Sequence, residues 1–370
     1  MNRAKTWILS FFAIEAAALL LLAAAAYLVD PFFQFRIKDK TYVLQEWFVS
    51  SGLIENYRYD TLLIGSSMTR NFDMNRFREK LGAEPLHIGL GGIRPVEINE
   101  LVRLAYDSGK AEKYYICVDL GFFGNPGEES RYPRYLLKKD FLSHLRYLLS
   151  YEVWFRYIPI DLGLVLCDRL GVKIPDKVAH LKEIDRLGDW EYNYRYRGEA
   201  EVAARYKRKI GRVPVLETAG LHERLTAQFD GYLDRFDFKK GEHIFFLPPY
   251  SSLFWCDTQR AGYFDIYLRA REYFVSAAAR RGAAVFDFQS AEFTTDLDNY
   301  RDIKHYRPEI NDLMVDAFAK GEFKVTEESF PESQRRLIEN TENFRKEHTD
   351  LFREEYKHPS EGSAHPSSND

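Results

Sequence analysis

The segment Thr61-Leu-Leu-Ile-Gly-Ser-Ser-Met68 decides the fold of this chain. Its first four residues form a short apolar run, which is typical of a buried strand, and Gly65-Ser66 supplies a turn directly after it. Met74, Phe77 and Leu81 then recur at helical spacing. A buried strand followed by a turn and an amphipathic helix is the repeating unit of a parallel sheet.

The same pattern returns further along the chain. Further strands are predicted at 86–88, 114–120, 243–247 and 283–288, and helices at 96–106 and 264–281. Because strands alternate with helices, the sequence predicts an α/β fold, with a parallel sheet and helices on both faces. Residues 129–239 interrupt the alternation with a helical insertion rich in arginine and tyrosine, in which 198–214 has the polar composition of a loop.

The N-terminus carries an apolar run from Trp7 to Val29, in which Glu15 is the only charged residue. At about 1.5 Å per residue, this run is long enough to cross a hydrocarbon core of roughly 30 Å. Arg3 and Lys5 precede it and favour a cytoplasmic N-terminus with the remainder outside. We therefore expect a single-pass cell-membrane anchor and an extracytoplasmic domain.

A cleaved signal peptide is the alternative reading of the same run. Ala24-Ala-Ala26 is an acceptable cleavage site, but the run is longer than the apolar core of most signal peptides.

The two ends of the chain differ from its centre. The connector after the anchor is aromatic-rich and is expected to pack on the globular part. Near the C-terminus, the capping-box sequence Ser329-Phe-Pro-Glu332 predicts one charged helix, and the Pro- and Ser-rich end is typical of disorder. The predicted units are the anchor (1–29), the connector (30–58), the globular domain (59–325, with the insertion 129–239) and a separate charged helix with a disordered tail (326–370).

The composition excludes several classes of function. Lys and Arg (52) nearly balance Asp and Glu (56), for a formal net charge of −4. Without a strong basic field, nucleic acid is not expected as a partner. The three widely spaced cysteines argue against a disulfide framework and a cysteine-rich zinc site. The sequence has no Gly-rich phosphate loop and no H-E-x-x-H motif, so we expect neither a cofactor nor a metal.

A serine follows the first predicted strand, at the sheet edge where open parallel sheets bind ligands. It is Ser67, in Gly65-Ser66-Ser67, the only G-x-S sequence in the chain. A serine that opens a helix has backbone N–H groups beside it that stabilise an oxyanion. The alternative is that Ser66 or Ser67 only caps that helix, which serines at such turns commonly do.

A second candidate motif lies after the last predicted strand. Asp302-Ile-Lys-His305 is the only D-x-x-H sequence in the chain. This spacing lets the carboxylate bond one imidazole nitrogen while the other nitrogen faces a serine, which is the arrangement that acyl transfer needs. Taken alone, such a pair is more often a surface turn.

Together these motifs resemble the SGNH/GDSL hydrolase superfamily, on Gly65-x-Ser67, the turn Gly89–Gly92 and Asp302-x-x-His305. The N-terminal apolar run, Ile64-Gly-Ser-Ser-Met68 and His305-Tyr306 are similar to its membrane-anchored surface-polymer branch. That branch includes teichoic-acid D-alanyl transfer proteins and alginate O-acetyltransferase-like proteins. The resemblance implies a three-layer, flavodoxin-like domain and acyl chemistry on a cell-surface polymer.

Carried over by position, the resemblance implies that Ser67 is the nucleophile, His305 the base and Asp302 the residue that orients the imidazole. It also implies that the N–H groups of Ser67 and Gly92 form the oxyanion hole.

The sequence departs from the family pattern at three positions. Ser66 stands where the family usually has an aspartate before the nucleophile, and His87 stands where the second block usually has an asparagine. The G-x-N-D of the third block is absent, and Asn125 is the nearest match to its asparagine.

Weaker candidates surround these motifs. Arg70 and Arg94 follow the two turns and would bind an anionic substrate group, or else belong to solvated helix faces. Tyr250, after two prolines, would line the ligand edge, although a simple strand end explains it as well. The arginines and tyrosines of the insertion suit sugar stacking, lipid head groups or a membrane partner, or form its core.

The expected function is a membrane-anchored, extracytoplasmic serine acyltransferase or esterase acting on a cell-surface polysaccharide or a teichoic-acid-like polymer. The alternative is a non-catalytic protein of the same fold that assists a membrane-bound O-acyltransferase through Glu15 and the insertion.

Overall fold

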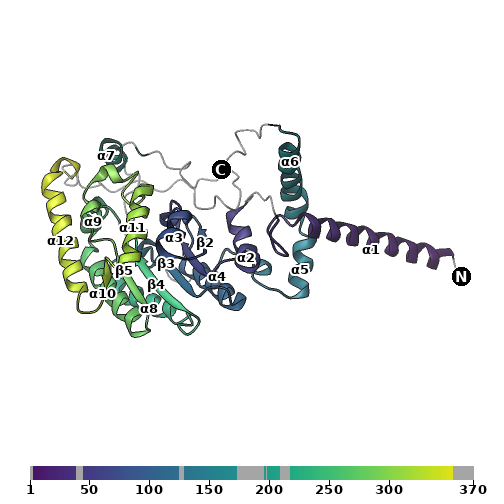
Figure 1. Cartoon of the computed structure of the whole chain (residues 1–370), viewed down its shortest axis with the longest axis horizontal. Coiled ribbons are helices and arrows are strands. Elements are labelled where there is room, and N and C mark those ends of the chain that lie inside the picture. Colours follow the sequence, from purple (N-terminus) through teal and green to yellow (C-terminus); the bar gives the residue numbers. More distant parts are fainter. Residues whose placement is uncertain are drawn as a thin grey trace.

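A six-stranded, mostly parallel sheet forms the centre of the molecule (Figure 1). The computed structural model describes residues 3–38, 45–124, 129–172, 196, 198–208 and 217–352. The strands are β1 (Thr61–Gly65), β2 (Pro85–Gly89), β3 (Lys113–Cys117), β4 (Glu242–Leu247), β5 (Ala284–Asp287) and β6 (Lys324–Val325). Their order across the sheet is β2-β1-β3-β4-β5-β6, and only β6 is antiparallel to its neighbour. The prediction of an α/β protein with a parallel sheet is confirmed, whereas β6 was not predicted.

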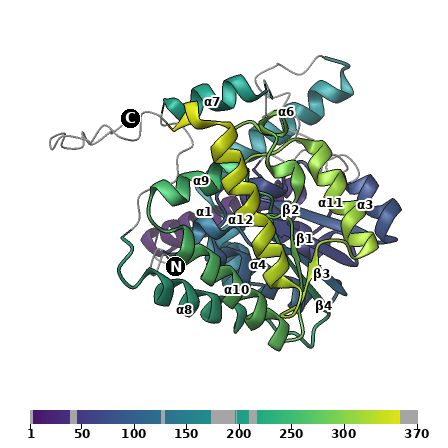
Figure 2. The same cartoon turned by 90° about the vertical axis from the view of Figure 1, so that its left-hand side faces the viewer.

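Helices cover both faces of the sheet. On one face α3 (Met74–Leu81) packs against α11 (Pro308–Lys320), and on the other α4 (Pro95–Ser108) and α10 (Phe264–Arg280) both pack against α8 (Leu221–Leu233). Figure 2 shows α3 and α11 on one side of the strands and α8 and α10 on the other. Because both faces are covered, the residues of β1 are buried throughout and do not alternate between apolar and polar.

The turns of the first repeat are set by local chemistry. Asp73 caps α3 by accepting a hydrogen bond from the Asn75 N–H, and Gly82 ends the helix with a left-handed φ of 60°. Strands β1 and β2 pair in register up to Gly65 opposite Gly89. The turns after these two strands therefore begin side by side at one edge of the sheet.

Helix α1 (Arg3–Val29) projects away from the globular part (Figure 1). Its most apolar window has a mean hydropathy of 2.3, and none of that window is buried. By length and composition it is able to cross a membrane, as an anchor or as a signal sequence. At its far end Ala26 is fully buried, so the last turn of α1 is part of the globular core.

The connector packs on the globular part. It contains α2 (Glu46–Asn56), which lies against α4 and buries Val49, Leu53 and Ile54.

The described part of the insertion is mainly helical. It comprises α5 (Phe141–Leu148), the π-helical turn η4 (Val153–Tyr157), α6 (Ile158–Arg169), α7 (Glu199–Lys207) and α8. Helix α7 corrects the loop-like interpretation of 198–214, of which 198–208 are described. Val202 and Tyr206 are buried, and this tertiary packing outweighs the polar composition of the stretch.

The C-terminal helix α12 (Phe330–Glu347) packs against α9 (Ser252–Arg260) and α10. Leu337 and Phe344 are buried in that contact. The helix therefore belongs to the same core as the sheet, although the sequence suggested a separate segment. The predicted disordered tail lies outside the described residues from 353 onward.

Candidate active site

Three candidate catalytic side chains meet at the carboxyl edge of the sheet. Ser67 opens a short 3₁₀ turn directly after β1, whereas Asp302 and His305 lie in the loop between β5 and α11. Ser67 Oγ lies 2.8 Å from His305 Nε2, and His305 Nδ1 lies 2.8 Å from Asp302 Oδ2. Both are hydrogen-bond distances. The fold thus brings the serine to the imidazole across 238 residues of sequence.

The loop holds Asp302 as a charged acceptor. Its Oδ1 accepts backbone N–H bonds from Lys304 and His305, each 2.9 Å long. Burial raises the pKa of the Asp302 carboxyl. The His305 imidazole and these two N–H groups lower that pKa by more than burial raises it, so the pKa lies below its usual range. An ionised Asp302 makes Nδ1 the protonated nitrogen of His305, so that Nε2 is the acceptor for the Ser67 hydroxyl.

A second contact fixes the two loops to each other. The Tyr306 hydroxyl donates to the Met68 carbonyl oxygen at 2.6 Å. Tyr306 follows His305 and Met68 follows Ser67, so this buried bond sets the separation of the base and the serine.

Asp119, which follows β3, was not identified from the sequence. Its buried carboxylate accepts hydrogen bonds from the Ser66 hydroxyl at 3.1 Å, from the Gly121 N–H at 3.1 Å and from the Tyr250 hydroxyl. Lys304 Nζ lies 3.7 Å from the same carboxylate. Asp119 therefore connects the loops after β1, β3, β4 and β5. The available signal was an acidic residue directly after a buried strand, at the ligand-binding edge.

The two serines have different environments. Ser66 is buried, and its hydroxyl accepts from the Met68 N–H at 3.3 Å and donates to Asp119. Ser66 therefore caps the short turn, while Ser67 contacts the imidazole.

The predicted oxyanion residues lie in neighbouring turns. Gly92 lies in the turn after β2, with a left-handed φ of 71° that favours glycine. The Leu90 N–H donates to the Gly65 carbonyl oxygen at 2.9 Å, which holds this turn against the one that carries Ser67. His87 is buried in β2 beside Thr69. Asn125 lies outside the described residues, and the oxyanion pair Ser67 and Gly92 stays a prediction.

The weaker candidates Arg70 and Tyr250 have structural contacts. Arg70 Nη2 lies 2.8 Å from Glu46 Oε2, and its Nε donates to the Gly89 carbonyl oxygen at 3.3 Å. The ion pair fastens α2 to the turn after β1, and the second bond joins that turn to the end of β2. Tyr250 is fully buried and donates to Asp119, so its ring does not line an open surface.

Arg94 belongs to a buried cluster centred on Glu97. The Glu97 carboxylate is fully buried and lies 2.9 Å from both Arg94 Nη2 and Arg131 Nε. Burial raises the pKa of Glu97, but the bonds from Arg131 and Arg94 outweigh it and lower that pKa to about 2. Glu97 therefore holds both guanidinium groups at one end of a cavity.

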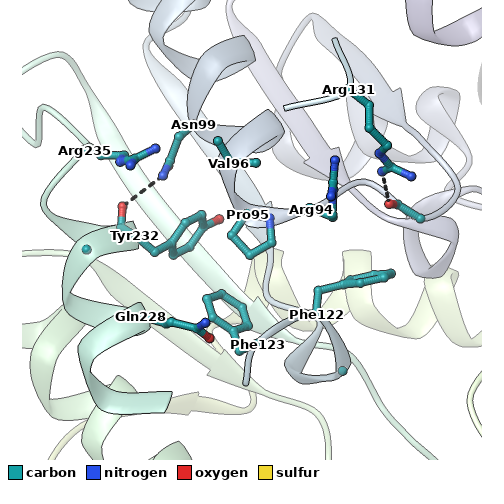
Figure 3. Close-up of a pocket in the computed structure, with 13 residues that line it drawn as sticks. Arg94, Pro95, Val96, Asn99, Phe122, Phe123, Arg131, Gln228, Tyr232 and Arg235 are labelled. Atoms are coloured by element: carbon teal, nitrogen blue, oxygen red, sulfur yellow. Dashed lines mark hydrogen bonds between the residues drawn. The ribbon is translucent and has the colours of Figure 1, made fainter. Parts of the chain in front are cut away.

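This cavity has a volume of about 550 Å³ and lies between α4, α8 and the turns after β2 and β3 (Figure 3). Figure 3 shows Arg94 and Arg131 at one end and Arg235 at the other. Among the described residues no acidic side chain lines it. The other side chains in its wall are Pro95, Val96, Asn99, Phe122, Phe123, Gln228 and Tyr232.

Two buried polar atoms in the cavity wall have no hydrogen-bond partner within the described part of the chain. They are Asn99 Oδ1 and the Tyr232 hydroxyl. Such groups cost free energy when they are unpaired. A small adjoining cavity shares Tyr232 with the larger one and reaches Ser66 and Asp119. The large cavity is therefore close to the turn that carries Ser67.

Comparison with known proteins adds no relative: no family model, no curated protein and no solved structure matches the chain. Across the described ranges, no cluster of three His, Cys, Asp or Glu side chains is arranged to hold a metal ion. The fold and the site thus define an α/β protein with a mostly parallel six-stranded sheet, a long apolar N-terminal helix and a Ser-His-Asp cluster at the sheet edge.

Proposed function

We propose that the chain is a membrane-anchored, extracytoplasmic serine acyltransferase or esterase that modifies a cell-surface polysaccharide or a teichoic-acid-like polymer. The observation that carries this proposal is the pair of 2.8 Å contacts that join Ser67, His305 and Asp302. The strand order β2-β1-β3-β4-β5 agrees with a three-layer, flavodoxin-like SGNH domain, whose ligands bind where the strand order reverses.

In the proposed reaction, Ser67 Oγ attacks the carbonyl carbon of an acyl donor while His305 Nε2 takes its proton. Asp302 stabilises the resulting imidazolium, and the N–H groups of Ser67 and Gly92 bind the oxyanion. The leaving group departs with the proton from His305, which leaves an acyl-serine ester. A polymer hydroxyl then gives its proton to His305 and attacks the ester, which restores Ser67; water in its place gives hydrolysis.

The large cavity supports a polymer with anionic groups as the acceptor. Arg94, Arg131 and Arg235 line it without an acidic side chain of the described residues among them, and Glu97 behind two of them offsets part of their charge. Arginine binds carboxylates and phosphates with directed N–H groups.

The end of α1 supports an anchor that is retained. Ala26, at the alternative cleavage site, is fully buried in a helix. Arg36 Nη2 donates to the carbonyl oxygens of Tyr27 and Leu28 at 2.9 and 2.8 Å. Cleavage after Ala26 would remove this buried residue from the core of the folded protein, which favours a retained anchor.

A fluorophosphonate probe tests the serine chemistry directly. We expect it to label Ser67 in the purified full-length protein, because His305 activates that hydroxyl, and mass spectrometry of the labelled peptide identifies the site. Ser67→Ala is expected to lose the label, and Ser66→Ala to keep it. An unlabelled Ser67 in folded wild-type protein would argue for the non-catalytic partner of a membrane-bound O-acyltransferase.

The topology is tested on spheroplasts treated with an external protease. We expect the protease to remove the globular part, because Arg3 and Lys5 keep the N-terminus inside. Mass spectrometry of the untreated protein is expected to find α1 still attached. A mature N-terminus at Tyr27, or a domain that the protease does not reach, would rule out the proposed anchor.

A further inference from the structure

Helix α6 buries Ile158 and Leu164 but exposes a row of leucines on its outer face. Leu162, Leu166 and Leu170 are 52%, 56% and 66% exposed, and their four-residue spacing puts them on one face. The only charged residue of α6 before its C-terminal Asp-Arg pair is Asp161, which is buried and lies 2.8 Å from Lys38 Nζ. A water-facing helix has the opposite arrangement, with its charges outward and its leucines inward.

The exposed apolar surface continues on the preceding turn. Tyr151 and Phe155 are 75% and 71% exposed, and their ring centroids lie 4.7 Å apart. We call Tyr151, Phe155, Leu162, Leu166 and Leu170 the apolar platform. Soluble monomers rarely expose contiguous apolar patches of this kind, and such patches mark contacts with proteins or membranes.

The platform adjoins the exit of the anchor. Helix α1 packs on α5 and α6 with its carboxyl end, and Figure 1 shows α5 and α6 lying across the axis of α1, on the side from which α1 projects. Directly after α1, the Asp30 carboxylate accepts a 2.8 Å bond from the Tyr147 hydroxyl of α5 and three backbone N–H bonds. The Lys38–Asp161 ion pair adds a second tie, to α6. The crossing helix and the platform therefore have a fixed relative position.

We propose that the platform lies in the outer leaflet of the bilayer that α1 crosses, with its leucines and aromatic rings at the boundary between head groups and acyl chains. Aromatic side chains favour this depth, and an apolar helix face beside a charged rim binds membranes in the plane of the surface. Exposed Arg156 and Arg169 flank the platform and suit anionic head groups.

The bilayer is favoured over a protein partner because α1 delivers the platform to it without a further association step. Because α1 and the platform hold a fixed position relative to each other, placing both in the bilayer also fixes the orientation of the domain. The carboxyl edge of the sheet then stays at a set distance from the membrane. The inference rests on retention of α1 in the membrane and is independent of the chemistry of Ser67.

Quenching by brominated lipids tests the proposal in the full-length chain. Leu166→Cys is combined with Cys167→Ser, which removes the one native cysteine that is not buried, and is labelled with an environment-sensitive fluorophore. The protein is reconstituted into vesicles of phosphatidylethanolamine and phosphatidylglycerol. We expect a blue-shifted emission and a loss of intensity when the acyl chains are brominated.

The matched control is Leu313→Cys, also combined with Cys167→Ser, since Leu313 is 49% exposed and its helix α11 lies away from α1 (Figure 1). Its label is expected to keep a water-like emission and to resist quenching. A water-like emission at position 166 would overturn the proposal. A shielded emission that brominated lipids leave unchanged would overturn it too, and its loss on dilution to one chain per vesicle would identify a second copy as the cover. If Ser67 still reacts with the probe in either case, the proposed function stands without the platform.

Discussion

Ser67→Ala is expected to lower acyl turnover by several orders of magnitude, and His305→Ala by a comparable factor. The first change removes the nucleophile. The second leaves the Ser67 hydroxyl without the Nε2 acceptor that lies 2.8 Å away. Since both groups act in one proton transfer, the double variant should be little slower than either single variant. The assay is turnover of a model ester or of acyl transfer to a surface polymer.

Ser66→Ala is the matched control, because it makes the same change one residue earlier. It removes the bond to Asp119 and the cap on the Met68 N–H, which is expected to cost about 1 kcal/mol of stability with little loss of rate. Circular dichroism checks that each variant is folded. An active Ser67→Ala with an inactive Ser66→Ala would move the nucleophile to Ser66. Full activity in both would reject a serine mechanism.

Most of the sheet was predictable because its central strands are buried on both faces. Such strands appear in the sequence as apolar runs, and the prediction found β1 to β5 from them. The two-residue β6 is too short to leave a pattern. Helix α7 has a polar composition, and its signal is confined to Val202 and Tyr206, whose burial depends on elements far away in the chain.

The candidate site was predictable where its residues stand in a local motif. Ser67 follows a strand and a glycine, and Asp302 and His305 are close enough in sequence to contact each other. Asp119 has no such motif, because its partners Ser66 and Tyr250 are 53 and 131 residues away. Only the folded sheet, which brings the carboxyl ends of its strands to one edge, reveals that these residues share one network.

Asp287→Ala is expected to destabilise the protein by about 3–5 kcal/mol, because it leaves a buried arginine without its counter-ion. Asp287 and Arg271 are both fully buried, and Asp287 Oδ2 lies 2.6 Å from Arg271 Nη2. Ser333 Oγ of α12 donates to the same oxygen at 2.6 Å. Arg271 Nε and Nη1 have no hydrogen-bond partner among the described residues. The guanidinium also lies over the Trp255 and Phe330 rings, but neither ring supplies a counter-ion.

Asp234→Ala is the matched control, since Asp234 pairs with Arg281 at 2.5 Å but is 62% exposed. Exposed pairs of this kind contribute about 0–1 kcal/mol. Urea unfolding of the full-length variants, followed by tryptophan fluorescence, should therefore give a much lower midpoint for Asp287→Ala alone. Asp287 ends β5, and the loop with Asp302 and His305 begins there, so partial loss of this corner should also reduce probe labelling of Ser67. Equal unfolding midpoints for the two variants would mean that α12 and the buried ion pair do not hold the loop that carries Asp302 and His305. Tyr306 and Asp119 would then be the supports of that loop.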